Sequence, residues 1–173
     1  TVNPGRSLPI GRPMTTEHRD LPDPSGNEQF DRARALLRDQ REDEALDWFE
    51  VAMETSDEPQ VRASAAAHVA ALLLGFGRPW EVATFATRVR EFSADAALGD
   101  LLEASACVQL GDATGALELL GSDGPVPAPA DRWFPCSAAG ARSTRIRALA
   151  LAGRSDDARR EMEAALTAAP DAP

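Results

Sequence analysis

LALAGRSDDARREMEAALTAAPD, residues 149–171, has three counterparts earlier in the chain, and the four stretches together decide the fold. The counterparts begin at Leu36, Leu73 and Cys107. In each stretch a turn pair precedes an amphipathic segment, and a residue small or branched enough for close helix approach follows. The steps from one turn pair to the next are 37, 34 and 42 residues. The turn pairs are Gln40-Arg41, Gly77-Arg78, Gly111-Asp112 and Gly153-Arg154, and the small or branched residues are Ala45, Val82, Ala116 and Ala158.

A period near 34 residues with a helix–turn–helix in each unit is typical of tetratricopeptide repeats. The chain resembles this family from about Asn27 to Pro170. The family pattern has a small residue mid-repeat, a large apolar residue four positions later, a small residue three beyond that, and proline near the end. The first stretch supplies Ala45, Phe49 and Ala52, and the last supplies Ala158, Met162, Ala165 and Pro170.

The resemblance implies an all-α fold, a right-handed α-solenoid of about four helix pairs over residues 27–57, 58–93, 94–124 and 137–170. The chain departs from the pattern in two places. The second stretch inverts small and large residues with Val82, Ala86 and Val89, and the third breaks off at Gly121–Gly124 without a long second helix. The alternative is an ordinary helical bundle whose alanine and leucine pattern imitates repeats, which would change only how the helices stack.

Local signals place the helix ends. Ser25 and Glu28 have the spacing of a capping box, and Pro59 suits the first turn of a helix that runs to about Leu74. A helix is expected over about 43–55, with acidic residues at its start that suit the helix dipole. Pro79 starts the next helix. The expected caps of later helices are Ser93 or Asp95, Asp112, and Ser155.

Composition excludes several classes of protein. The 173 residues carry a net charge of −10, and all 18 basic residues are arginine. An acidic chain is unsuited to nucleic acid, which selects basic surfaces. No apolar run reaches the roughly 20 residues of a membrane span, and the start has no signal-peptide core. We therefore expect one cytoplasmic domain. Its abundant alanine and its use of arginine alone as the basic residue resemble the composition of proteins from high-GC bacteria.

Residues 1–26 differ from the rest, because five prolines and three glycines interrupt any helical period. We expect an extended arm. Its first part, Thr1–Pro13, carries Arg6 and Arg12 and no acid, and Met14 resembles a translation start. Two interpretations stay open: a vector-derived or disordered leader, or a ligand segment, native or fused, that binds the solenoid in cis or in trans.

The long connection 121–136 contains four prolines and the aromatic pair Trp133 and Phe134. Prolines forbid a continuing helix here. The aromatic side chains either fold back over neighbouring helices as a plug or form a lid that closes on a ligand.

Catalytic and metal-binding patterns are missing from the sequence. His18 lies in the proline-rich arm and His68 on a predicted helix, and no HxxxH or CxxC pair offers metal ligands. No glycine-rich phosphate loop is present. Cys107 reads as a small apolar helix residue and Cys136 as a loop residue. We expect no enzyme activity, no metal and no cofactor.

The repeat frame predicts which residues line a concave groove, because the first helix of each pair faces it. The chaperone-binding members of the family place lysine and asparagine at positions where Phe30, His68, Leu98 and Leu102 stand here, so that ligand class is not expected. The planar guanidinium group of arginine binds carboxylates and backbone carbonyls well. Each groove arginine, Arg34, Arg38 or Arg147, could instead pair with a nearby acid of the same chain. The predicted groove residues are Phe30, Arg34, Arg38, His68, Ala71, Leu101, Ser105, Thr144 and Arg147.

These patterns favour a non-catalytic adaptor that binds a peptide or protein segment in the groove. Two alternatives are a ligand-sensing domain of a bacterial regulator and an accessory subunit of an enzyme complex. Self-association is also open, since no capping helix follows the last repeat. A homodimer could form through that end or by exchange of the proline-rich arm.

Overall fold

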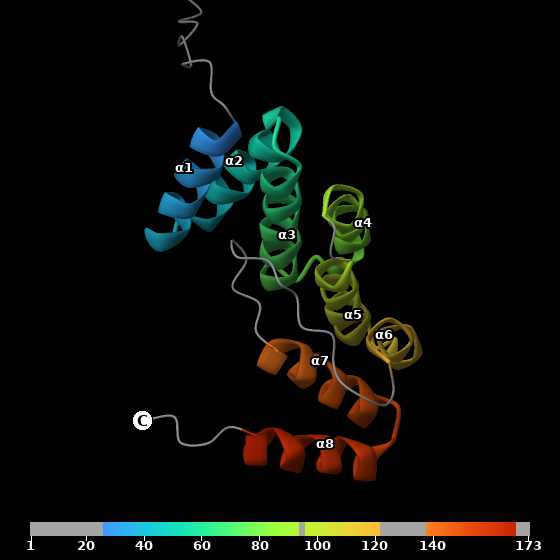
Figure 1. The fold of residues 1–173 in the computed structure, drawn as a ribbon. Helices are drawn as coiled ribbons and strands as arrows, with labels where there is room; N and C mark the ends of the chain where they lie inside the picture. Colours follow the sequence, from blue (N-terminus) through green and yellow to red (C-terminus); the bar gives the residue numbers. More distant parts are fainter. Residues whose placement is uncertain (1–25, 94–95, 122–137, 169–173) are drawn as a thin grey trace, which may run out of the picture.

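The computed structural model describes residues 26–93, 96–121 and 138–168, and these residues are helical throughout apart from short connections (Figure 1). Residues 1–25 of the predicted arm, with Thr1–Pro13, Met14 and the predicted cap Ser25, lie outside them, as do Trp133, Phe134 and Cys136 of the long connection, whereas Gly26 begins the first helix. Within the described residues no helix combines the length and apolar character needed to cross a bilayer. The helices are α1 (Gly26–Arg38), α2 (Glu42–Thr55), α3 (Pro59–Gly75), α4 (Val82–Phe92), α5 (Ala97–Leu110), α6 (Ala113–Leu120), α7 (Ala138–Leu151) and α8 (Ser155–Ala168), with a 3₁₀ turn, η1 (Pro79–Glu81), ahead of α4.

The four predicted turn pairs adopt one geometry. At each turn the first residue of the pair has a left-handed backbone, with φ of 60° at Gln40, 70° at Gly77, 80° at Gly111 and 73° at Gly153. The next amide donates to the carbonyl five residues back, over 2.8–2.9 Å in all four turns. This is the Schellman ending of a helix, which a left-handed residue permits. The four turns therefore share one local backbone geometry.

The start of each second helix follows its local sequence. Arg41, Arg78 and Arg154 each pair with an acid three residues on. The third turn differs, because Asp112 caps α6 by accepting the amide of Gly115 over 2.9 Å, as predicted. Pro79 opens a 3₁₀ turn rather than α4 itself, a common form of helix entry.

Two predicted boundaries need correction. α8 begins at Ser155, and the amide of Ala158 donates to the carbonyl of Arg154. Ser155 is therefore the first helical residue and not the cap. Ser93 ends α4, and α5 is preceded by Ala96 without a side-chain cap. The alternative cap, Asp95, lies outside the described residues.

The helices pack in an order that follows the chain. Each one contacts its neighbour along the sequence, and the first helices also contact one another, α1 with α3, α3 with α5, and α5 with α7. Among the described residues no second helix contacts another second helix. Figure 1 shows α4 and α6 beside α3 and α5, with α7 and α8 at the far end. Packing is therefore limited to near neighbours, as in repeat proteins.

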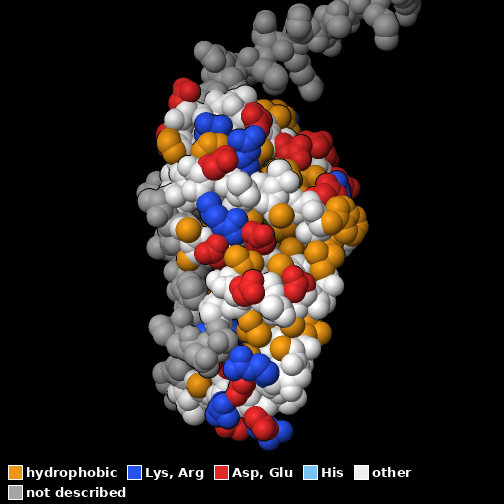
Figure 2. All heavy atoms as spheres, turned by 90° about the vertical axis from the view of Figure 1, so that its right-hand side faces the viewer, with side chains coloured by type: hydrophobic (Ala, Val, Ile, Leu, Met, Phe, Trp, Pro, Cys, Tyr) orange, Lys and Arg blue, Asp and Glu red, His pale blue; other side chains and the backbone are white. Residues whose placement is uncertain are grey.

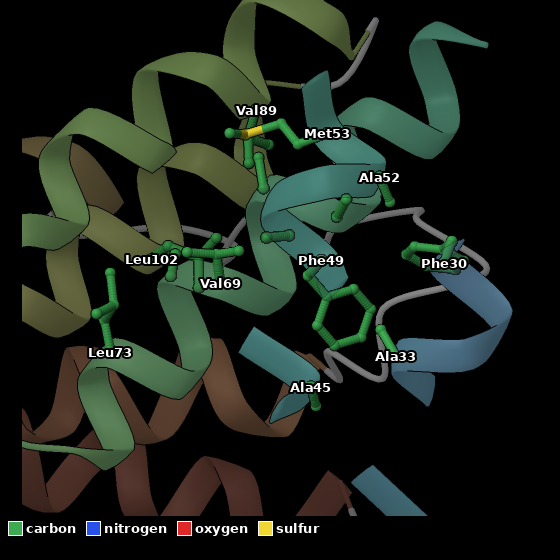
Figure 3. Packing of buried hydrophobic residues seen from close by; sticks show 14 of the residues in the cluster. Phe30, Ala33, Ala45, Phe49, Ala52, Met53, Val69, Leu73, Val89 and Leu102 are labelled. Carbon is green, nitrogen blue, oxygen red and sulfur yellow. The ribbon is translucent and has the colours of Figure 1, made fainter. Parts of the chain in front are cut away.

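The main core spans α1 to α5 (Figure 3). The predicted small or branched positions are all buried, with Ala45, Val82 and Ala116 at 0% exposure and Ala158 at 8%. α3 is buried on almost every side from residue 61 to residue 70, as expected for a helix that is apolar all round. A second cluster joins α5, α6 and α7 around Leu101, Ala116 and Ala148.

Candidate functional site

The candidate site is the side of the first helices, α1, α3, α5 and α7, that packing against the other described helices leaves accessible. We call this side the inner face. We define it by six exposed or half-buried residues of α1, α3, α5 and α7. Successive first helices contact one another, so these residues come from adjoining helices. They are Arg34, Arg38, Ala71, Ser105, Thr144 and Arg147.

Three of the predicted groove residues belong to the core instead. Phe30 is 2% exposed, Leu101 5% and His68 7%. The ring of Phe49 stacks on His68 at 4.5 Å between centroids, and Phe30 meets both rings edge-on. Phe30 and His68 fill the contact between α1 and α3. Leu101 of α5 belongs to the cluster that α5 forms with α6 and α7. We therefore correct Phe30, His68 and Leu101 from ligand contacts to core residues.

His68 has a structural setting. Its Nδ1 lies 2.7 Å from the carbonyl oxygen of Ser64, one helical turn earlier. A ring nitrogen at that distance donates its proton to the carbonyl. The imidazole thus serves as a stacked aromatic group with a satisfied hydrogen bond, which is the role expected of a buried histidine on a helix.

Two residues of the inner face join neighbouring helices. Ser105 Oγ on α5 lies 3.3 Å from Thr144 Oγ1 on α7. Each hydroxyl is also within reach of the carbonyl one turn before it in its own helix, at 2.8 Å and 3.2 Å. This contact joins α5 to α7. It brings together Ser105 and Thr144, the groove residues predicted in the third and fourth repeats.

Most described arginines have a partner. Arg32 lies 4.2 Å above the ring of Trp48, and Arg62 lies 3.9 Å above Phe92 while donating to the carbonyl of Met53. Arginines favour both kinds of contact. Nine others pair with carboxylates: Arg41, Arg78, Arg88, Arg90, Arg142, Arg145, Arg154, Arg159 and Arg160.

Arg38 and Arg147 differ from these arginines. Both are exposed, and within the described part of the chain neither forms an ion pair or lies over an aromatic ring. Arg38 Nε makes a long 3.4 Å hydrogen bond to the carbonyl of Arg34, one turn back. The inner face thus presents guanidinium groups on its first and last helices, with the small side chains of Ala71, Ser105 and Thr144 between them.

The opposite side of the molecule has a different character. Figure 2 views the side on which α4 and α6 lie, and acidic and basic side chains are neighbours there. Arg88 pairs with Glu91 in α4, and Arg90 reaches Asp100 and Glu103 of α5. The three arginines Arg78, Arg88 and Arg90 of this region are thus engaged by acids of the same chain.

No arrangement for catalysis was found among the described residues. Burial raises the pKa of the Cys107 thiol, helped by the charges of Asp112 and Glu103, so the thiol is a weaker nucleophile than a free cysteine. No three metal-binding side chains gather in the described ranges. The predicted lid residues, Trp133 and Phe134, are outside them.

Comparison with protein-family models, with curated proteins and with solved structures finds no match to this chain.

Proposed function

We propose that this protein is a non-catalytic adaptor, a right-handed α-solenoid of tetratricopeptide-like helix pairs that binds an extended peptide or protein segment along its inner face. The four equivalent turns support the repeat interpretation. The direct contacts between successive first helices support a continuous face. Helical surfaces of this kind recognise chains through side chains spaced along one row.

The observation that carries the proposal concerns Arg38 and Arg147. The protein has a net charge of −10 and an excess of carboxylates. Nine described arginines pair with those carboxylates, whereas Arg38 and Arg147 stay exposed and pair with no carboxylate of the described residues. A guanidinium fork binds a carboxylate through two parallel hydrogen bonds. The ligand is therefore a segment with acidic side chains or a terminal carboxylate. Its backbone lies over Ala71, Ser105 and Thr144, the small residues between the two arginines.

Selection from a displayed random-peptide library, with the full chain as target, tests this function. Enriched peptides should be acidic, and calorimetry then measures their affinity. The double variant Arg38→Glu with Arg147→Glu should weaken binding by about tenfold or more, because each change replaces an attraction by a repulsion. Arg88→Glu on the opposite side is the matched control and should leave the affinity unchanged. Equal affinity for the double variant and the parent chain would refute the assignment.

A further inference from the structure

Two positions of every first helix remain accessible in the folded chain, and we call them the open positions. They lie six and two residues before the left-handed turn residue, so they are one turn apart and share a side of the helix. All eight residues at these positions are exposed or half-buried. In chain order they are Arg34 and Arg38, Ala71 and Gly75, Ser105 and Gln109, and Arg147 and Leu151. Leu151 of α7 is thus the equivalent of Arg38 of α1.

The open positions hold three arginines and no acid. The whole chain has 28 acidic and 18 basic residues, so this set has the opposite sign of charge from the protein. Contacts on this side connect the middle helices to their neighbours: Gln109 Nε2 donates to the carbonyl of Leu74 in α3 over 3.3 Å, and Ser105 meets Thr144 of α7 at 3.3 Å. An acidic segment lying over the open positions therefore meets opposite charge on α1 and α7 and no like charge at these positions.

The first and last helices of the set differ in one residue. Both open positions of α1 are arginine, whereas in α7 Arg147 is followed one turn later by Leu151, which is 53% exposed. Residues at this spacing have Cβ atoms about 5–6 Å apart, and an extended chain advances about 3.3 Å per residue. Ligand residues that are one or two positions apart can therefore contact Arg147 and Leu151 together. Covering the exposed leucine with an apolar side chain favours binding.

We propose that Leu151 is a specificity-determining residue of the inner face, and that the ligand carries an apolar side chain one or two residues from the carboxylate bound by Arg147. This inference rests on the proposed peptide-binding function and specifies its ligand. The α1 end presents two basic residues and selects acidic side chains alone. The ligand thus has an acidic end and an end that combines an acid with an apolar residue, and this difference sets its direction along the face.

Parallel selections from a displayed random-peptide library test the proposal, with the full chain, Leu151→Arg and Leu110→Arg as targets. Peptides enriched on the parent chain should carry an apolar residue within two positions of an acid. Leu151→Arg gives α7 the two arginines that α1 has, so a second acid should replace the apolar residue. Leu110→Arg is the matched control, because it adds the same charge at a residue that is 57% exposed but lies outside the open positions. It should keep the apolar preference.

Calorimetry with one peptide enriched on the parent chain measures the contact itself. Leu151→Ser should weaken its binding about fivefold or more, because apolar surface is lost from the interface. A second peptide, with serine in place of the apolar residue, should bind the parent chain and Leu151→Ser equally. Identical peptides enriched on the parent chain and on Leu151→Arg, or unchanged affinity of the first peptide for Leu151→Ser, would overturn the proposal.

The arginine variants separate this proposal from the function on which it rests. If Arg38→Glu with Arg147→Glu abolishes binding while the Leu151 variants keep the parent preference and affinity, only the role of Leu151 falls. If the parent chain enriches no acidic peptide, the proposed function falls and the role of Leu151 falls with it.

Discussion

At the scale of single residues, the aromatic cluster around Phe49 connects three helices. Phe49 of α2 is fully buried between Phe30 of α1 and His68 of α3, with ring centroids at 5.4 Å and 4.5 Å. Edge-on and offset stacked rings add to the stabilisation that burial itself gives. Figure 3 shows the Phe49 ring on the side of α2 that faces Ala33, a residue too small to keep α1 at a distance.

Phe49→Ala should therefore lower the free energy of unfolding by about 3–5 kcal/mol, the usual cost of emptying a buried aromatic site. Urea unfolding followed by circular dichroism measures it. Val51→Ala, two residues away at a side chain that is 41% exposed, is the control and should change stability by about 0.5 kcal/mol or less. Comparable losses in the two variants would contradict the cluster.

The sequence could place Phe49 in the core but could not do so for Phe30 and His68. Phe49 stands four residues after Ala45, and both lie in a helix whose apolar side is clear from its spacing. Phe30 and His68 sit on first helices that use more than one side for packing. Helical periodicity identifies a buried stripe, but it does not tell whether a further side is covered by another first helix.

At the scale of the elements, the turn within each helix pair is the most regular feature. Gln40 holds the left-handed backbone that glycine holds in the other three turns. That conformation costs a residue with a side chain about 1–2 kcal/mol. A Cβ added at Gly77 would meet no atom within 4 Å, so only the backbone conformation opposes a side chain there.

Substitutions in the turns should therefore have opposite signs. Gln40→Gly should raise the free energy of unfolding by about 0.5–1 kcal/mol, because it relieves the left-handed conformation. Gly77→Ala should lower it by about 1 kcal/mol for the same reason. Gly75→Ala is the control two residues earlier, inside α3 with open space around the new Cβ, and should raise stability. Thermal unfolding gives all three values, and a shared sign would contradict this account of the turns.

The turns were predictable because glycine, capping residues and acids follow local rules. The short α6, which ends at Leu120, was visible in the glycines from Gly121 onward. The ion pairs Arg41–Glu44 and Arg154–Asp157 have a spacing of three residues and could be read from the chain. Arg90 pairs with Asp100 of the next helix, and no spacing within one helix indicates such a contact. Contacts between elements depend on how the helices dock, which local patterns leave open.

At the scale of the whole molecule, the distribution of arginine partners separates two sides. On the side of α4 and α6, Arg78, Arg88 and Arg90 are paired with acids of the same chain. On the inner face Arg38 and Arg147 keep their guanidinium groups exposed at the two ends of a row of first helices. Both arginines could be selected from the repeat frame, but only the packed structure shows that neither of them pairs with a carboxylate among the described residues.

Hydrogen exchange, measured with and without a peptide selected on the full chain, tests the central claim most directly. Binding along the inner face should slow amide exchange in α1 and α7, which carry Arg38 and Arg147, and leave α4 and α8 unchanged. Slowed exchange confined to α4 or α8, or an equal change in all helices, would contradict the proposed binding face.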